Sequence, residues 1–229
     1  MKRYLEQKYP GQTFNVQEVS ATYGDAYLDC SSTSEPKAIF EVHASFQDAP
    51  GDYRTLSEIE FEDFVDTYYD YQFNRVIEKA FAKEGVKVSS YLSANSTAGD
   101  DGLPDNLTDY FKEDKPNDFD GEIFLGSDST TKLNFGGVTN RVFKRLSRQY
   151  RIKLFEPYLV VISGDNSYTI LLEDLKKQPL SDAWLGKSDL DGFLTAVINY
   201  SFKNGKPNLS ADKINREISS GHIDKIWAE

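Results

Sequence analysis

The chain has 229 residues, of which 37 are acidic and 26 basic, so its net charge is −11, and 14% of its residues are aromatic. This length and aromatic content predict a folded protein with a full hydrophobic core, and the lack of any apolar run of roughly 18 residues excludes a membrane-spanning helix. The single cysteine, Cys30, excludes a disulfide framework, and the negative net charge argues against nucleic acid as a partner, because phosphates repel it.

The first fifty residues predict a short helix followed by antiparallel strands. Residues 2–9 have apolar side chains at helical spacing, and a Pro-Gly pair ends the helix. Alternation of apolar and polar residues then predicts strands at 14–19, 26–30 and 38–46. We therefore expect an antiparallel meander with one buried face.

A change of period follows. Residues 57–82 predict a long helix, because aromatic and aliphatic side chains recur every three or four residues. Acidic residues crowd its first half, where the helix dipole favours anions. Residues 86–92 then predict another strand.

An acidic segment occupies the middle of the chain. Residues 100–128 contain ten acidic and two basic residues, which predicts a long solvated connection, with a short strand at 123–125 as a further option. An EF-hand is excluded, since the loop positions of the entering ligand and the final glutamate hold Pro116 and Ser127. Incidental weak calcium binding is the alternative to a plain acidic loop.

The second half begins with a basic helix. Its residues 141–153 contain six basic and no acidic side chains. Strands are expected at 155–163 and 168–173, joined as a hairpin, and a helix is expected from Ser188 until an Asn-Gly pair at 204–205. Ser210 is expected to cap a last helix.

These elements predict an α+β fold of antiparallel meander sheets with helices packed on one face, a helix-on-sheet arrangement of the cystatin type. We expect an α+β unit at 1–98, an acidic connecting segment at 99–130 and a second α+β unit at 131–229. The two units resemble each other in element order, so an internal duplication is one hypothesis, and their packing into a single domain is another.

The basic helix supplies the candidate partner-binding residues. These are Arg141, Lys144, Arg145, Arg148 and Arg151. They could bind an acidic partner, a phosphate surface or a lipid head group. The alternative, which we favour from charge alone, is that they pair internally with the acidic segment just upstream.

No residue pattern predicts catalysis, a cofactor or a metal site. His43 shares the wetter face of its strand with Glu41 and Ser45, so an exposed strand histidine is the main interpretation and an acid–base residue the alternative. Cys30 is expected to be a buried small hydrophobic residue, and His222 a packing or surface residue. With only two histidines, a histidine-rich metal site is excluded.

The opening of the chain resembles a family of uncharacterised secreted lipoproteins of Gram-positive bacteria. Residues 4–16 read YLEQKYPGQTFNV, where the family has a helix-to-strand start of the form YLEEKYG-x-x-F-x-V, and the residues 40–42 and the helix at 66–71 follow in the family's order. The resemblance covers about 80 residues of this chain. It departs from the family pattern at Pro10 and in lacking the leader and lipobox cysteine. It implies an extracellular, lipid-anchored ectodomain and no catalytic residues.

Three functions follow as hypotheses. The first is a non-enzymatic cell-envelope ectodomain that binds a protein or wall component and meets the membrane only through a removed N-terminal anchor. The second is a cytoplasmic immunity or inhibitor protein whose acidic face masks a basic toxin. The third is a small cup-shaped acid–base enzyme that uses His43.

Overall fold

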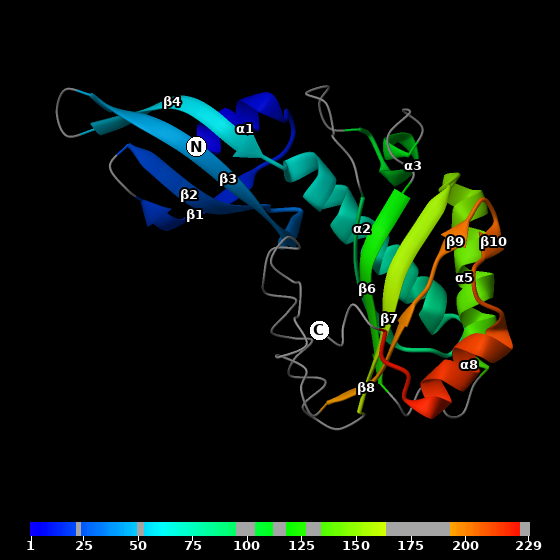
Figure 1. The fold of residues 1–229 in the computed structure, drawn as a ribbon. Helices are drawn as coiled ribbons and strands as arrows, with labels where there is room; N and C mark the ends of the chain where they lie inside the picture. Colours follow the sequence, from blue (N-terminus) through cyan, green and yellow to red (C-terminus); the bar gives the residue numbers. More distant parts are fainter. Residues whose placement is uncertain are drawn as a thin grey trace.

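The fold consists of two β-sheets joined by one long helix (Figure 1). The computed structural model describes residues 1–21, 24–49, 53–94, 104–111, 118–126, 134–163 and 193–224. The described elements confirm the α+β class and the packing of helices on sheets. No helix within these ranges is both long and apolar enough to cross a membrane.

The first sheet is an antiparallel meander in the order β1-β2-β3-β4. Its strands are β1 (Phe14–Ala21), β2 (Asp25–Ser32), β3 (Glu35–Ala49) and β4 (Tyr53–Glu62). The alternation predicted for residues 38–46 is confirmed, because Ala38, Phe40, Val42 and Ala44 are all buried. Helix α1 (Lys2–Lys8) is the predicted N-terminal helix, and its Leu5 belongs to the same core.

Strand β4 corrects the predicted helix at 57–82. Residues up to Glu62 are extended, and the helix begins only at Phe64. The glutamates at 58, 60 and 62 alternate with other residues at a period of two, which fits a strand as well as an acidic helix start. These residues form a strand because they pair with β3, and the spacing of residues along the sequence does not reveal this pairing.

A β-bulge near the end of β4 changes which side chains face the core. Ala44 pairs with Ile59 and His43 with Phe61, so Glu60 is an extra residue opposite His43. Beyond the bulge Glu62 pairs with Val42, and its side chain is only 3% exposed. Two neighbouring glutamates of one strand therefore have different environments.

Helix α2 (Phe64–Ala82) spans both sheets. At its first residue, Phe64 packs against the rings of Tyr9, Phe14 and Phe40 in the first sheet's core. Two turns later, Phe73 packs against rings of the second half of the chain, including Phe119, Tyr150 and Phe155. The same helix thus contributes to both cores, and the buried side chains form one continuous cluster.

The second sheet is mixed and has the order β10-β9-β7-β6-β5, with β8 also paired to β7. Its strands are β5 (Val88–Ala94), β6 (Asp118–Gly126), β7 (Leu154–Ile162), β8 (Leu194–Asn199), β9 (Phe202–Lys203) and β10 (Lys206–Pro207). Strands β6 and β7 are parallel, and α5 (Phe135–Tyr150) connects them. Helices α2, α5 and α8 (Ala211–Ser220) lie on one side of this sheet, whereas the short α3 (Leu107–Tyr110) lies near its upper end (Figure 1).

The free edge of β5 is covered by one stripe of α2 side chains. Glu78 accepts a hydrogen bond from the backbone N–H of Ser90, Asn74 bonds to Leu92, and the Asp70 carboxylate accepts from the backbone N–H of Ala94. These three side chains follow at intervals of four residues and therefore lie on one helix face. They occupy the position of a further strand and leave this edge unavailable for pairing.

Several predictions for the second half are wrong. The acidic segment contains β6, an interior strand of the sheet in which Ile123, Phe124 and Leu125 are fully buried. The optional short strand at 123–125 is therefore confirmed, and the solvated connection is wrong for residues 118–126. This also removes the calcium-loop alternative at 118–121, which is strand. The segment predicted as helix from 188 contains β8, because its apolar residues 196–198 are buried on both faces of the sheet.

The Asn-Gly pair predicted to end that helix is instead a two-residue hairpin loop. It joins β9 to β10, and Asn204 and Gly205 have φ angles of 50° and 81°, the left-handed region in which both residue types are favoured. The predicted hairpin strand at 168–173 and the start of the predicted helix at Ser188 lie outside the described residues. The cap at Ser210 is confirmed, since its hydroxyl accepts a hydrogen bond from the backbone N–H of Lys213 at 3.2 Å.

The division into two units around a segment at 99–130 stays a prediction, but the change from the first sheet to the second comes earlier in the chain, between β4 and β5. Strand β5, which we assigned to the first unit, pairs with β6 of the second sheet. The first sheet is a pure meander and the second contains a parallel pair, so the two halves differ in topology.

Candidate functional site

The predicted basic helix is α5, and its burial pattern explains how its charges are displayed. Asn134 caps its start by accepting a hydrogen bond from the backbone N–H of Gly137 at 2.9 Å. The apolar stripe faces the core and is fully buried at Val142, Phe143 and Leu146. The basic residues between these positions are therefore left on the opposite, exposed face.

Two arginines of α5 contact the last turn of α2 or the residues just after it. Arg141 donates hydrogen bonds from Nε and Nη2 to Oε2 of Glu84, at 3.2 and 2.8 Å. Arg145 lies 3.8 Å from the other carboxylate oxygen of Glu84 and donates to the backbone carbonyl of Ala80 at 3.1 Å. That carbonyl belongs to the last turn of α2, where the helix dipole favours a cation. These two arginines thus have a structural role.

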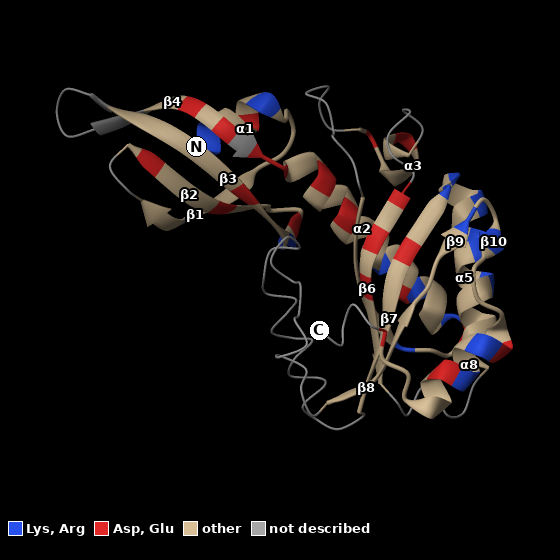
Figure 2. Cartoon of the chain, viewed as in Figure 1, with Lys and Arg blue, Asp and Glu red and all other residues tan. Residues whose placement is uncertain are grey.

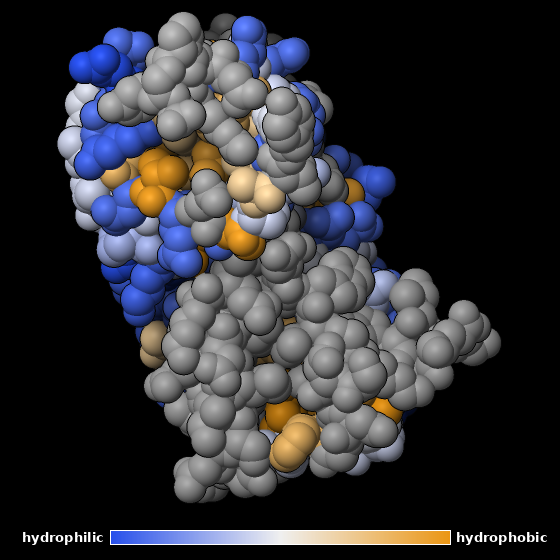
Figure 3. Space-filling model, turned by 90° about the vertical axis from the view of Figure 1, so that its left-hand side faces the viewer, coloured by the Kyte–Doolittle hydropathy of each residue, from blue (hydrophilic) through white to orange (hydrophobic). Residues whose placement is uncertain are grey.

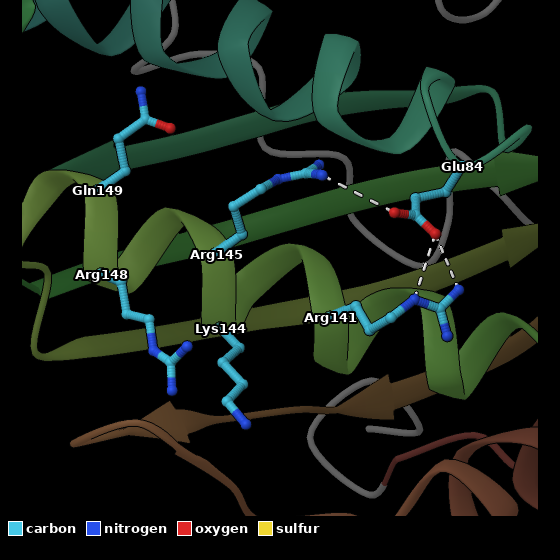
Figure 4. Close-up of a pocket in the computed structure, with 6 residues that line it drawn as sticks. All are labelled: Glu84, Arg141, Lys144, Arg145, Arg148 and Gln149. Atoms are coloured by element: carbon cyan, nitrogen blue, oxygen red, sulfur yellow. Dashed lines mark hydrogen bonds and ion pairs between the residues drawn. The ribbon is translucent and has the colours of Figure 1, made fainter.

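Lys144 and Arg148 differ from this pair. They extend from α5 side by side and away from α2, whereas Arg145 and Gln149 point towards it (Figure 4). Among the described residues, neither Lys144 nor Arg148 makes an ion pair or hydrogen bond through its side chain. Both residues are exposed.

The exposed face of α5 forms an open depression of about 560 Å³. It is lined by Glu84, Arg141, Lys144, Arg145, Arg148 and Gln149. The lining contains four cations and a single carboxylate, so the depression carries excess positive charge (Figure 4). We refer to these six residues as the basic depression.

The structure brings together four of the five predicted partner-binding residues. Arg151 is not among the lining residues, because it is the left-handed C-cap of α5, with φ 58°. Internal pairing with the acidic segment, the alternative we favoured, stays a prediction, and in the described parts of the chain Arg141 and Arg145 pair with Glu84. Sequence reasoning missed Glu84 and Gln149, since only tertiary packing places Glu84 beside α5.

His43 has a carboxylate neighbour that the sequence did not predict. Its Nδ1 lies 2.9 Å from Oε2 of Glu60, and the ring of Tyr27 stacks on the imidazole with centroids 4.3 Å apart. Glu60 comes from β4, the segment we had assigned to a helix. Catalysis by His43 stays a prediction.

Cys30 is buried as predicted, and burial, with a smaller contribution from the charge of Asp29, raises the pKa of its thiol to about 12.

Besides Asp70, whose pKa burial raises well above its ordinary value, two carboxyl groups in the interior have raised pKa values. Burial, reinforced by the charge of Asp120, raises the pKa of Glu122 to about 7, and among the described residues its Oε1 has no hydrogen-bond partner. Burial likewise raises the pKa of Asp63 to about 6, although a hydrogen bond from Thr67 acts in the opposite direction. Neither lies in the basic depression.

The fold is similar to that of a solved bacterial protein. The crystal structure of a DUF5037 family protein from Ruminococcus gnavus ATCC 29149 matches with a TM-score of 0.62 over 96% of this chain and 97% of that chain. Sequence identity is 14%, so the likeness shows a shared fold and nothing further. No family model matches the sequence, and no curated protein matches it.

Proposed function

We propose that this chain is the ectodomain of a cell-surface lipoprotein, which binds an anionic polymer of the cell wall through the basic depression. The observation that carries the proposal is the presence of Lys144 and Arg148, two exposed neighbouring cations that no described residue pairs. The resemblance of residues 4–16 to secreted Gram-positive lipoproteins supports the cell-surface location.

The distribution of charge favours an anionic ligand at this place. The molecule as a whole carries −11, yet Lys and Arg gather along α5, while acidic residues mark α2 and β6 (Figure 2). A positive patch on a negative molecule orients it, because only one face attracts a polyanion and the others repel it. Arginine can also bind phosphate or carboxylate groups through two parallel hydrogen bonds.

The composition of the depression favours a polymer over a folded protein. All six lining residues are charged or amide side chains. Protein interfaces are commonly centred on aromatic or aliphatic anchors that fill pockets on the partner. The space-filling view shows the face turned away from α5, on which the described hydrophobic residues gather mainly over the first sheet, among hydrophilic neighbours (Figure 3). A chain of phosphodiester or carboxylate groups, as in polyol phosphate polymers, matches the basic depression without such an anchor.

The test is binding of the full chain to purified Gram-positive cell walls, measured by sedimentation. We expect binding to intact walls, a loss of binding after the polyol phosphate polymers are extracted, and weakening as salt concentration rises. Lys144→Glu with Arg148→Glu should weaken binding by about tenfold or more, because two attractive contacts become repulsive. These positions are preferable to Arg141 and Arg145, which contact Glu84 and the last turn of α2.

A matched control is available on α8. Lys213→Glu with Arg216→Glu makes the same change in net charge on an exposed helix outside the basic depression, and should leave binding unchanged. If both double variants weakened binding equally, the loss would come from the change in net charge and not from the basic depression, and the proposed site would be overturned. Equal affinity for single-stranded DNA of matched charge would show recognition of phosphate in general instead of the wall polymer.

The cellular location has a separate test. The reading frame upstream of Met1 should encode a leader that ends in a lipobox cysteine. A reading frame that starts at Met1 with no such leader would favour the cytoplasmic immunity or inhibitor protein instead, and would overturn the cell-surface proposal.

A further inference from the structure

The outer face of the first sheet gathers three side chains that can ligate a metal ion. Asp25 begins β2, His43 lies in the middle of β3, and Glu60 lies near the end of β4. Each offers one ligand atom, and these atoms all lie within 4.8 Å of one another. Three adjacent strands supply one residue each, so the backbone that carries the ligands is held by ladder hydrogen bonds.

The bulge in β4 is what brings Glu60 to this position. Opposite His43, the strand has two residues in place of one, and the additional residue is Glu60. A bulge of this kind redirects a side chain and is common beside functional sites. The result is a carboxylate oxygen 2.9 Å from Nδ1 of His43.

Two further residues support these side chains. The ring of Tyr27 stacks on His43 with an interplanar angle of 6°, which restricts the orientation of the imidazole. The hydroxyl of Ser45 lies 2.8 Å from Oδ1 of Asp25 and 2.6 Å from Oε1 of Glu60. The Ser45 hydroxyl has one proton and can donate it to only one of these two carboxylates, so the other carboxylate oxygen faces the hydroxyl oxygen without a proton between them. A cation bound between the two carboxylates would offset this repulsion between oxygens.

We propose that Asp25, His43 and Glu60 bind one divalent transition-metal ion of the Zn²⁺ class. Zinc accepts imidazole nitrogen and carboxylate oxygen at about 2.0–2.2 Å, and sites with three protein ligands keep a fourth position for water. The side chains of His43 and Glu60 are 23% and 41% exposed, which leaves that position open to solvent. Two carboxylates balance the charge of the ion. A metal ion binds the neutral imidazole through a ring nitrogen that carries no proton.

The choice of ion follows from the ligands. A nitrogen ligand suits zinc and its neighbours, whereas magnesium and calcium prefer sites made of oxygen. The site lies on the first sheet, whereas the basic depression lies on α5, which packs against the second sheet. The proposal therefore does not depend on the proposed function. The resulting metal–water group would be available to a carboxylate or phosphate from solution.

The experiment is titration of the full chain, stripped with a chelator, with Zn²⁺ in an isothermal calorimeter. We expect one ion per chain, and a loss of affinity of about tenfold or more in His43→Gln and in Glu60→Gln, because each removes a direct ligand. Co²⁺ should give the visible absorption of a tetrahedral site in the wild-type chain and lose it in both variants. Mg²⁺ should give no heat of specific binding.

The control is His222→Gln, since His43 and His222 are the two histidines of the chain. It should bind Zn²⁺ as the wild-type chain does. Failure of the wild-type chain to bind Zn²⁺ would overturn the proposal and leave an ordinary His–Glu ion pair. Unchanged binding in a folded His43→Gln variant, verified by circular dichroism, would place the ion elsewhere and overturn it equally.

Discussion

Asn74 pairs with Leu92 as a neighbouring strand would. The backbone N–H of Leu92 donates to Oδ1 of Asn74 at 2.8 Å, and Nδ2 of Asn74 donates to the carbonyl of Leu92 at 2.7 Å. Nδ2 of Asn74 also donates to the carbonyl of Asp70, and its Oδ1 also accepts a hydrogen bond from the hydroxyl of Ser90. A single buried side chain thus completes the backbone hydrogen bonding of an edge strand.

Replacing Asn74 by leucine should destabilise the protein strongly. The substitution keeps the approximate volume but leaves the N–H and carbonyl of Leu92 buried without partners, at a cost of about 2–4 kcal/mol. The measurement is urea unfolding followed by circular dichroism. Lys79→Ala, at an exposed position of the same helix, is the control and should change stability by less than about 0.5 kcal/mol. A loss of the same size in both variants would contradict the role of the amide.

Glu62→Gln should destabilise the contact between α1 and β4. Oε2 of Glu62 accepts hydrogen bonds from Nζ of Lys8 and the hydroxyl of Tyr9, each at 2.8 Å, and Oε1 accepts from the backbone N–H of Phe64. Loss of the charge weakens all three, and we expect a decrease in unfolding free energy of about 1.5–3 kcal/mol. Glu58→Gln, exposed on the same strand, should have almost no effect in the same urea titration. A similar loss in the control would argue against a specific interaction.

The buried carboxyl of Glu122 should make stability depend on pH. Its pKa in the folded protein is about 7, above the ordinary value of about 4.5, so between these values the folded chain holds a proton that the unfolded chain has lost. The contribution of this group to stability is therefore complete below pH 4.5 and decreases as pH rises towards 7. Glu122→Gln should unfold at a higher temperature than the wild-type chain at pH 8 and show a smaller decrease between pH 5 and pH 7.

The control for this prediction is Glu156→Gln, an exposed glutamate on the neighbouring strand β7. Its pH profile should follow that of the wild-type chain. If Glu122→Gln retained the full wild-type decrease between pH 5 and pH 7, another group would be responsible.

Gly136→Ala should loosen the packing of α5 on α8. A Cβ at this position would lie 2.3 Å from the carbonyl oxygen of Ala211 and 2.8 Å from its Cα, and these backbone atoms can move only with the helix. We expect a loss of about 1–3 kcal/mol in thermal or urea unfolding, as for other overpacked sites. Gly137→Ala meets only the side chain of Asn134 and should cost less. An equal effect at both positions would show loss of the N-terminal cap instead of a clash between helices.

The parts of the fold that the sequence predicted are those in which local pattern and tertiary environment agree. The strand around Phe40 alternates cleanly because one face is buried and the other is not. Helix α5 was predicted from the helical spacing of its apolar residues, and its basic residues all avoid this buried stripe. Four residues of the basic depression followed from that same spacing.

The errors arise where tertiary contacts override the local signal. Apart from an optional short strand at 123–125, β6 was assigned to a solvated loop because of its aspartates, although Asp118, Asp120 and Glu122 alternate with other residues as a strand requires. Glu122 is buried against expectation for its residue type. Strand β8 is a short apolar run, which periodicity cannot distinguish from a buried helix. Glu60 joined His43 only through the bulge, and no local pattern in the sequence reveals a bulge.

The extra residue in β4 also has an evolutionary consequence. Deleting Glu60 would leave Ile59 opposite Ala44, Phe61 opposite His43 and Glu62 opposite Val42, so the strand would keep its alignment while one metal ligand vanished. A single codon lost or gained at this point could thus abolish or create the ion site without rebuilding the sheet. Related chains should accordingly fall into two length classes between Ile59 and Glu62, and only the longer class should retain the acidic partner of His43.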